Sequence, residues 1–407
     1  MNVLTPLPVA TAFCGSLPRV SIVRSATPRF TADGGPELEQ HLERTCEKIA
    51  AGIRGLIPRP KLEAVLLGGG YGRGEGGVLQ TPRGERPYND LEFYVCLRGN
   101  RHLNERRFGR ALHVLGEILT PQAGVEVEFK ITSLAEFADA PISMFSYDLM
   151  LGHRWLVGQP DLLTGCPQHR EAEDIPLSEA TRLLMNRCSG LLFAREKLQK
   201  REFTGADADF VRRNIAKAEL ALGDAVLVAH GCYHWSVRER HRHIERMARE
   251  KTHPWIESVR RHHAIGVEFK LHPQRSTASR EELLAEHSSV TALAEKIWLW
   301  LEARRLKTII SSPRGYAELS LSKCGETSPF RNVLVNLKAL GLRPLLEARA
   351  TRHPRERILS VLPLLLWEPA TLTAPELLRF VQRELQTHAM KFPEIMHAYR
   401  RLWTRVN

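Results

Sequence analysis

Two acidic side chains stand one residue apart in the stretch NDLEFYV, which runs from Asn89 to Val95. Side chains of a β-strand alternate between its two faces, so Asp90 and Glu92 are expected to project from the same face. Two carboxylates this close repel each other, and a divalent cation relieves the repulsion by taking oxygens from both. The pair therefore predicts a site for Mg²⁺ or Mn²⁺, against the simpler interpretation that both acids lie on the wet face of a sheet.

A third acid is expected from the later stretch VEVEFKI, residues 125–131. Glu126, Glu128 and Lys130 would share one face of this strand. Three carboxylates can hold two ions about 4 Å apart, one of which activates a hydroxyl while the other holds a leaving pyrophosphate. The residues alone leave either Glu126 or Glu128 as the third ligand.

A glycine-rich loop, LLGGGYGRGEGG, precedes these acids at residues 66–77. It contains the GxGxxG pattern of dinucleotide-binding proteins, but that pattern must open a helix, and the following GVLQTPRGERPYND carries two prolines and further turn signals. A kinase glycine flap requires a lysine-bearing strand with HRD and DFG motifs, and a P-loop requires GxxxxGK[ST]. The sequence has none of these motifs, so all three interpretations fail.

The glycine turn and the acidic strands together resemble the DNA polymerase β-type nucleotidyltransferase superfamily over roughly residues 60–135. That superfamily has a Gly-Gly or Gly-Ser turn after a strand, an acid pair on the next strand and a third acid on a later strand. Gly69 and Gly70 stand at the turn, and Arg73 continues it in the manner of minimal nucleotidyltransferases. The resemblance favours Glu128 as the third acid, because FKITSLAEF is similar to the basic residue and loop that follow this acid in polymerase β.

The resemblance implies a metal-dependent enzyme that transfers a nucleoside monophosphate from an NTP to a hydroxyl of a small molecule, an RNA end or a protein. Glycines let the backbone approach phosphates, and an arginine can add a bidentate contact. The implied catalytic and metal-binding residues are Asp90, Glu92 and Glu128, and the implied nucleotide-binding residues are Gly69, Gly70, Arg73 and Lys130. The alternative is a catalytically silent nucleotide- or RNA-binding regulatory module on the same fold.

The predicted fold class is α+β, with an N-terminal nucleotidyltransferase-type α/β domain at 36–175 that contains a small mixed sheet. The patterns indicate strands ending near residue 67 and at 88–97 and 125–131, with a helix at 106–119. Residues 1–35 are expected to form a flexible arm. Residues 76–88 are expected to be an inserted hairpin or loop over the site.

Residues 176–407 carry helical periodicity and predict a large all-α domain, in one piece or in two lobes that divide near 270–280 or 312–328. This domain is expected to complete an acceptor site. The candidate acceptor residues are Lys217, Asp224, Tyr233 and Lys270. Asp224 lies in an apolar helix, where the simpler expectation is a buried ion pair with Lys217 or a neighbouring arginine. The stretch VEFKLHPQR, residues 267–275, is expected to form a surface strand or turn.

The charge of the chain is uneven. The net charge is +12, and residues 231–280 carry eleven Lys and Arg residues against five Glu residues, which leaves +6 in this block, with seven of the 17 histidines. Such a block suits a polyanion, RNA included, or a solvated helical face. Arg238 and His243 match the loose R-x4-6-H motif of helical HEPN ribonucleases, which arises easily by chance in an Arg/His-rich helix.

The compartment and membrane expectations follow from composition. The 407 residues contain seven scattered cysteines without a CxxC pair, which is typical of thiols in a reducing compartment, so a cytoplasmic protein is expected. The longest apolar run, VLPLLLW at 361–367, is far shorter than the roughly 20 residues that span a bilayer. It predicts a core helix and no membrane partner.

Overall fold

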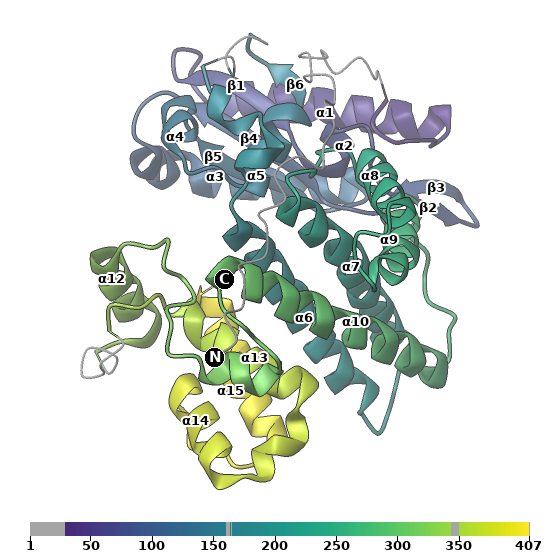
Figure 1. The fold of residues 1–407 in the computed structure, drawn as a ribbon. Coiled ribbons are helices and arrows are strands. Elements are labelled where there is room, and N and C mark those ends of the chain that lie inside the picture. The colour runs from purple at the N-terminus through teal and green to yellow at the C-terminus, as the bar shows by residue number, and fades with distance from the viewer. Residues whose placement is uncertain (1–28, 160–162, 164, 343–349, 407) are drawn as a thin grey trace. The chain divides into compact units, whose positions relative to one another are not determined.

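The computed structural model of the protein has a four-stranded mixed sheet, a separate two-stranded sheet and many helices (Figure 1). This agrees with the predicted α+β class. The structure describes residues 29–406 apart from 160–162, 164 and 343–349. The chain divides into two units: the first holds Met1–Ile175, Leu227–His243 and Leu271–Pro273, and the second holds Pro176–Val226, Ile244–Lys270 and Gln274–Asn407.

Every strand among the described residues lies in the first unit. Its elements in chain order are α1 (Pro36–Leu56), β1 (Leu62–Leu67), α2 (Gly69–Gly72), β2 (Val78–Thr81), β3 (Gly84–Pro87), β4 (Leu91–Leu97), α3 (Arg101–Ala123), β5 (Val127–Thr132), α4 (Leu134–Asp139), α5 (Met144–Leu151), β6 (Arg154–Val157), η2 (Pro167–His169) and η3 (Ala172–Asp174). The strands predicted at 88–97 and 125–131 are present with shifted ends.

The helix predicted at 106–119 is longer than expected at both ends. It begins at Arg101 because the side chain of Asn100 accepts a hydrogen bond from the Leu103 amide, 3.1 Å away. It ends at Ala123 because Gly124 takes the left-handed conformation, with φ of 76°. The segment 76–88 forms the β2–β3 hairpin, which agrees with the hairpin expected there.

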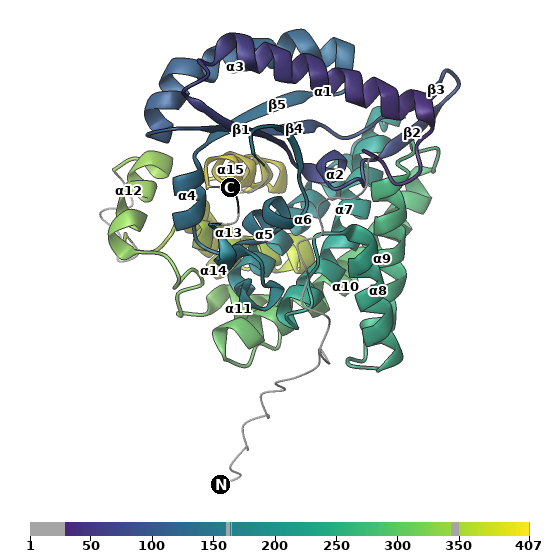
Figure 2. The ribbon, with the colours of Figure 1, turned by 90° about the horizontal axis from the view of Figure 1, so that it is seen from above.

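The main sheet has the order β5-β4-β1-β6, with β4 and β5 parallel and β1 antiparallel to both β4 and β6. Alternate side chains divide between two hydrophobic clusters. Phe93 and Val95 pack into the cluster that α1 and α3 share, and these two helices lie side by side on one face of the sheet (Figure 2). Tyr94 and Cys96 pack on the opposite face against residues of α4 and α5. Even-numbered residues of β4 therefore point away from α1 and α3.

The amphipathic pattern of α1 is explained by burial, since Leu38, Leu42, Ile49 and Ile53 all contribute to the cluster beneath it. Residues 1–28 of the expected arm lie outside the described residues. Phe30 is buried in the same cluster, and Thr31 forms a β-bridge with Gly76.

The helices after Ile175 are α6 (Leu177–Leu198), α7 (Gly205–Ala229), α8 (Val237–Arg249), α9 (Ile256–Leu271), α10 (Arg280–Leu306), α11 (Pro313–Glu318), α12 (Pro329–Leu340), α13 (Arg355–Trp367), η5 (Pro369–Thr373), α14 (Pro375–Leu385) and α15 (Phe392–Val406). The second unit is built from these helices, with α7 and α8 each crossing a unit boundary. The apolar run 361–367 lies in α13 and is a core helix, as predicted.

One local prediction in the helical part is wrong. The stretch from Val267 to Leu271 belongs to helix α9 and not to a strand or turn. Val259, His263, Val267 and Leu271 are all buried and recur every four residues, which is helical spacing. The alternating pattern of VEFKL alone concealed this period, because the signal begins eight residues earlier. Among the described residues, no helix has the length and apolar character needed to cross a membrane.

Candidate metal and nucleotide site

The parallel pairing of β4 with β5 places the acids. Leu91 is paired with Val127, and Glu92 is paired with Glu128. The amide of Leu91 also donates to the carbonyl oxygen of Glu126, at 2.8 Å. Because the flanking Leu91, Phe93 and Val127 are buried against α1 and α3, Glu92 and Glu128 point to the opposite face. Asp90, one residue before β4, has the same parity.

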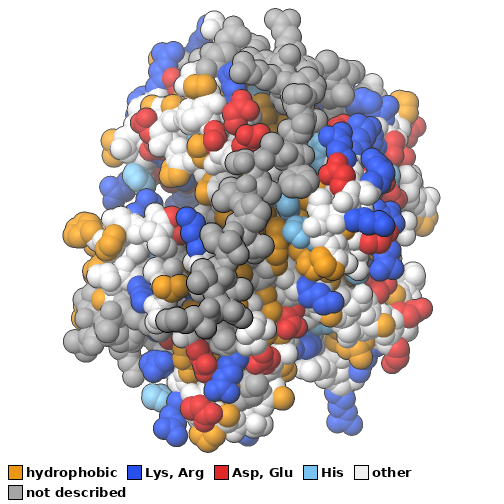
Figure 3. All heavy atoms as spheres, viewed as in Figure 1, with side chains coloured by type: hydrophobic (Ala, Val, Ile, Leu, Met, Phe, Trp, Pro, Cys, Tyr) orange, Lys and Arg blue, Asp and Glu red, His pale blue; other side chains and the backbone are white. Residues whose placement is uncertain are grey.

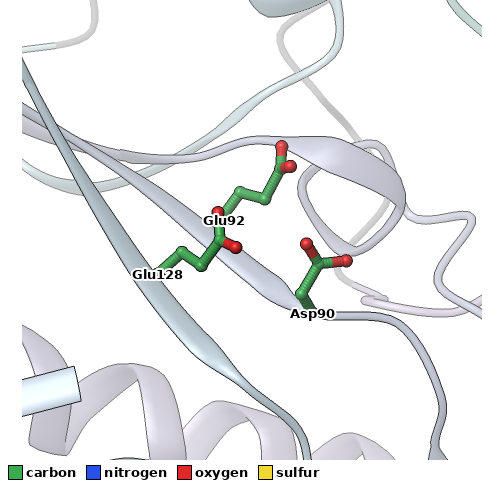
Figure 4. Close-up of side chains that lie close together, drawn as sticks. All are labelled: Asp90, Glu92 and Glu128. Atoms are coloured by element: carbon green, nitrogen blue, oxygen red, sulfur yellow. The ribbon is translucent and has the colours of Figure 1, made fainter. Parts of the chain in front are cut away.

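The three carboxylates converge, as predicted for Asp90, Glu92 and Glu128 (Figure 4). Each offers an oxygen, and these oxygens lie within 4.8 Å of one another. Asp90 is exposed, whereas Glu92 and Glu128 are partly buried. Glu126, the alternative third ligand, is exposed and lies before the first residue of β5. An all-oxygen donor set at this spacing fits a hard divalent cation such as Mg²⁺.

Lys130 meets the same carboxylates from the next same-face position of β5. Its Nζ lies 3.3 Å from Glu92 Oε1 and 3.3 Å from Glu128 Oε2. Burial would lower the pKa of Lys130, but the charge and hydrogen bonds of Glu92, followed by those of Glu128, raise it above its ordinary value. The lysine therefore neutralises part of the negative charge that a metal ion would otherwise meet.

Tyr94 holds Glu92 from the side of the core. Its hydroxyl donates to Glu92 Oε2 at 3.2 Å, and its ring is buried. Burial first, and then the charge of Glu92, raise the pKa of Tyr94. The phenol consequently stays protonated and remains a hydrogen-bond donor at neutral pH. Nothing in the acid motif indicated this role, because Tyr94 reads as an ordinary strand residue.

The glycine turn lies directly against Glu92. The Gly68 amide donates to the carbonyl oxygen of Glu92 at 2.9 Å. Gly69 has a φ of 63°, and a Cβ built on it would stand 3.6 Å from Glu92 Oε2. Gly69 and Gly70 open the short helix α2, so their amides belong to the first turn, where N–H groups have no partner within the helix. The turn therefore presents N–H groups beside the carboxylates.

Other glycines of the loop serve packing. A Cβ on Gly72 would lie 2.1 Å from the carbonyl oxygen of Leu67, and a Cβ on Gly76 would lie 2.0 Å from the ring of Tyr71. Tyr71 is buried, donates through its hydroxyl to the Gly77 carbonyl at 2.8 Å and accepts from the Tyr88 amide at 2.9 Å. The apparent GxGxxG pattern thus reflects a tightly packed turn that leads into the β2–β3 hairpin.

Arg73, a predicted phosphate contact, is held by a partner that the sequence did not indicate. Its Nη1 lies 3.0 Å from Asp148 Oδ2, and only 10% of its side chain is exposed. Tyr233, a predicted acceptor residue, donates to the same Asp148 oxygen at 3.3 Å, and Arg240 Nη1 donates to the Tyr233 hydroxyl at 3.2 Å. Arg73 and Tyr233 therefore meet in one buried polar network around Asp148.

Glu75, the last acid of the glycine motif, caps a helix. It is buried, and its carboxylate accepts from Ser236 Oγ at 2.6 Å and from the amides of Val237 at 2.8 Å and Arg238 at 3.4 Å. These amides belong to the first turn of α8, whose unpaired N–H groups and dipole favour a negative charge. Glu75 thus ties the glycine turn to the segment 227–243 of the same unit.

The remaining acceptor candidates lie in the second unit. Lys217 and Asp224 are on α7, and Lys270 is on α9. Asp224 is buried and faces His263 Nε2 at 3.4 Å, and its charge acts on the buried guanidinium of Arg187. His263 is thus one partner of Asp224, and the charge of Arg187 acts with it, in line with the simpler interpretation of a buried ionic group next to an arginine.

The loose R-x4-6-H motif lies on α8. Arg238 is exposed, and His243 is partly buried with its Nδ1 2.7 Å from the Cys232 carbonyl oxygen. That contact fixes the histidine ring to the backbone and provides a structural reason for the residue.

A groove of about 730 Å³ runs between α3 and the outer edge of β5. Glu128 and Lys130 line it from the strand, and Glu105, His113 and Glu117 line it from the helix. Glu128 belongs to both features, whereas Asp90 and Glu92 do not line the groove. The sequence did not predict it, since it depends on how α3 packs over the strand.

Comparison of the chain with models of known protein families, with curated proteins and with solved structures finds no match. The function must therefore be argued from the geometry of the site.

Proposed function

We propose that the protein is a metal-dependent nucleotidyltransferase that transfers a nucleoside monophosphate from an NTP to a hydroxyl acceptor. The single observation that carries this proposal is the convergence of Asp90, Glu92 and Glu128 beside the Gly69–Gly70 turn. Carboxylates suit divalent cations, and the N–H groups of a glycine turn suit phosphate oxygens, so the two features together match a metal-bound triphosphate. The resemblance to polymerase β-type nucleotidyltransferases points to the same chemistry.

In this proposal Asp90, Glu92 and Glu128 hold Mg²⁺ or Mn²⁺. Ions bound there would supply the positive charge that activation of the acceptor hydroxyl and departure of the pyrophosphate require. The amides of Gly69 and Gly70 donate to phosphate oxygens. Lys130 exchanges its contacts with Glu92 and Glu128 for a phosphate oxygen when the triphosphate binds. Tyr94 keeps the Glu92 carboxylate oriented through its hydroxyl.

Arg73 is assigned a different role from the one its motif suggested. Its guanidinium is paired with Asp148 and is nine-tenths buried, so we assign it to fixing the turn against α5 rather than to direct phosphate binding. In the proposed transfer, the acceptor hydroxyl gives up its proton to water and its oxygen bonds to the α-phosphorus. The bond from that phosphorus to the β-phosphate oxygen breaks, and pyrophosphate leaves.

The second candidate, a catalytically silent nucleotide-binding module, is favoured by one observation. Lys130 already bridges Glu92 and Glu128, so the negative charge of these two acids is partly balanced without a metal. In that case the glycine turn would bind a nucleotide without any transfer.

The decisive experiment incubates the protein with Mg²⁺ or Mn²⁺ and each α-labelled NTP, alone, with tRNA and with a metabolite extract. We expect label transfer that is lost in Asp90→Asn and Glu92→Gln and kept in the control Glu126→Gln. Metal-dependent NTP binding with no transfer to any acceptor would favour the silent module. Absence of both binding and transfer would reject the nucleotidyltransferase assignment.

A further inference from the structure

Three aromatic rings come together in the second unit from two distant segments of the chain. The rings of His253 and Trp255 are stacked, with centroids 4.6 Å apart and an interplanar angle of 14°. The Trp300 ring stands edge-on to both, with centroids 5.0 Å from His253 and 5.2 Å from Trp255. All three residues are partly exposed, in contrast to Trp298 on the same helix as Trp300, which is 1% exposed.

Cations surround Trp300 on its own helix. Lys296 and Arg304 stand four residues before and four after Trp300, so they share its face of α10, and Lys307 follows the helix directly as its C-cap. All three are exposed. Burial and, after it, the charge of Arg304 lower the pKa of His253, so the imidazole is neutral at pH 7.

The segment that leads into His253 adds more positive charge. Arg246 and Arg249, in the last turns of α8, and Lys251, directly after it, are exposed. Lys and Arg side chains gather over α8 and α9 in the space-filling view (Figure 3). Glu257, an acid near the rings in sequence, is already paired with Arg260 at 2.6 Å. Exposed Glu250 lies in the same segment, so residues 246–251 carry three positive charges and one negative charge, a net charge of +2.

We propose that this surface, formed by His253, Trp255 and Trp300 with Lys251, Lys296, Arg304 and Lys307, binds single-stranded nucleic acid. Unpaired bases stack on aromatic rings and phosphates pair with the cations, a combination that holds single strands without sequence preference. A duplex hides its base faces, and an acidic protein needs the cations but not the rings. The inference goes beyond the proposed transfer reaction and does not require it.

The test measures binding of a fluorescent single-stranded oligonucleotide by anisotropy, with RNA and DNA in separate arms. We expect Trp255→Ala and Trp300→Ala each to weaken binding about 5- to 150-fold, the range that loss of one stacked base gives, and Trp255→Phe to restore most of it. Arg304→Gln should reduce the slope of log affinity against log salt by about 0.7, and the exposed Lys338→Gln on α12 should leave it unchanged. Circular dichroism verifies that each variant is folded.

If the tryptophan substitutions weaken binding of both RNA and DNA, the surface binds single strands of either kind. If they weaken binding of RNA alone, RNA is the ligand. The proposal would be overturned if neither tryptophan substitution changed the affinity for the oligonucleotide, or if a duplex bound with the same affinity as the single strand. Equal competition by polyglutamate would overturn it in favour of an acidic protein partner. Asp90→Asn should bind the oligonucleotide as the wild type does, so failure of the catalytic proposal is distinguishable from failure of this one.

Discussion

Glu92 and Glu128 occupy paired positions on the parallel strands β4 and β5, and Lys130 Nζ lies 3.3 Å from an oxygen of each. Two carboxylates in direct register across a parallel pair are unfavourable without a cation. The protein supplies one from its own chain, and a metal ion at this site would have to compete with it. Lys130 thus balances part of the charge of Glu92 and Glu128.

The first prediction concerns the three acids. Glu92→Gln and Glu128→Gln should each weaken Mn²⁺ binding about 10-fold or more, because an amide contributes no charge to the ion. Glu126→Gln serves as the matched control, since this glutamate is exposed and lies outside the converging group. Isothermal titration calorimetry measures the affinities. A similar loss in Glu126→Gln would show that Glu126, and not Glu128 alone, is a ligand.

The second prediction concerns Lys130. Lys130→Met keeps much of the side-chain length but removes the competing ammonium, so Mn²⁺ should bind roughly 5- to 10-fold more tightly, as expected for the loss of an ion pair worth about 1 kcal/mol. The same variant should melt at a lower temperature without metal, because Glu92 and Glu128 then repel each other. Lys48→Met on α1 is the control for a surface lysine. Weaker Mn²⁺ binding in Lys130→Met would contradict the competition.

The third prediction concerns the packing of the glycine turn. Gly72→Ala should destabilise the first unit by more than about 3 kcal/mol, because its Cβ would stand 2.1 Å from the Leu67 carbonyl oxygen and the backbone would have to move. Gly55→Ala in α1 meets no atom within 4 Å and should stabilise the helix by about 0.5–1 kcal/mol. Urea unfolding compares the two. Equal effects would mean that the turn adapts without strain.

The fourth prediction concerns pH. Burial, followed by the charges of His243 and Arg240, lowers the pKa of His234 to about 4. The unfolded chain titrates near 6.5, so it takes up the proton first as the pH falls. The contribution of His234 to the free energy of unfolding should therefore be greatest above about pH 6.5. It should fall by up to about 1.4 kcal/mol per pH unit down to about pH 4 and stay constant below that pH.

The test of this prediction compares urea unfolding at pH 7.5 and 5.0. His234→Asn keeps an acceptor for the Ser236 amide but has no titrating group, so its pH dependence should be shallower than that of the wild type. His113→Asn, whose histidine side chain is 76% exposed, should keep the wild-type slope. If the free energy of unfolding of His234→Asn changed with pH as steeply as that of the wild type, a group other than His234 would cause the loss of stability in acid.

The sequence was most informative where the argument was local. Alternation along a strand placed Asp90 and Glu92 on one face, and the strand at 125–131 supplied Glu128. The α+β class followed from the change from alternating to helical periodicity. Alternation and periodicity need only the geometry of one element, and these inferences agree with the structure. The choice of Glu128 over Glu126 came instead from the family resemblance, and Glu128 is the one that lies beside Asp90 and Glu92.

Features that depend on partners distant in the sequence could not be predicted from the pattern of one segment. Asp148, which pairs with Arg73, lies in a short helix whose sequence, MFSYDLML, resembles ordinary core. The cap that Glu75 provides for α8 joins two segments with unrelated patterns. The contact between Trp255 and Trp300 joins a loop to a helix, and the residue pattern of neither segment indicates this contact. Tertiary packing determines which of these residues are in contact, and no short stretch of sequence contains both members of a pair.

The hydrogen bond from Ser236 to Glu75 spans 161 residues, and the first unit includes residues as late as Pro273. On a ribosome, the strands and the glycine turn emerge long before the helix start that receives the Glu75 carboxylate. Until then this carboxylate has no amides to accept from and favours solvent over the interior. The turn beside the acids can reach its final packing only after α6 and α7 have been synthesised. A fragment that ends at Ile175 would therefore contain every acid of the cluster and still lack the finished site.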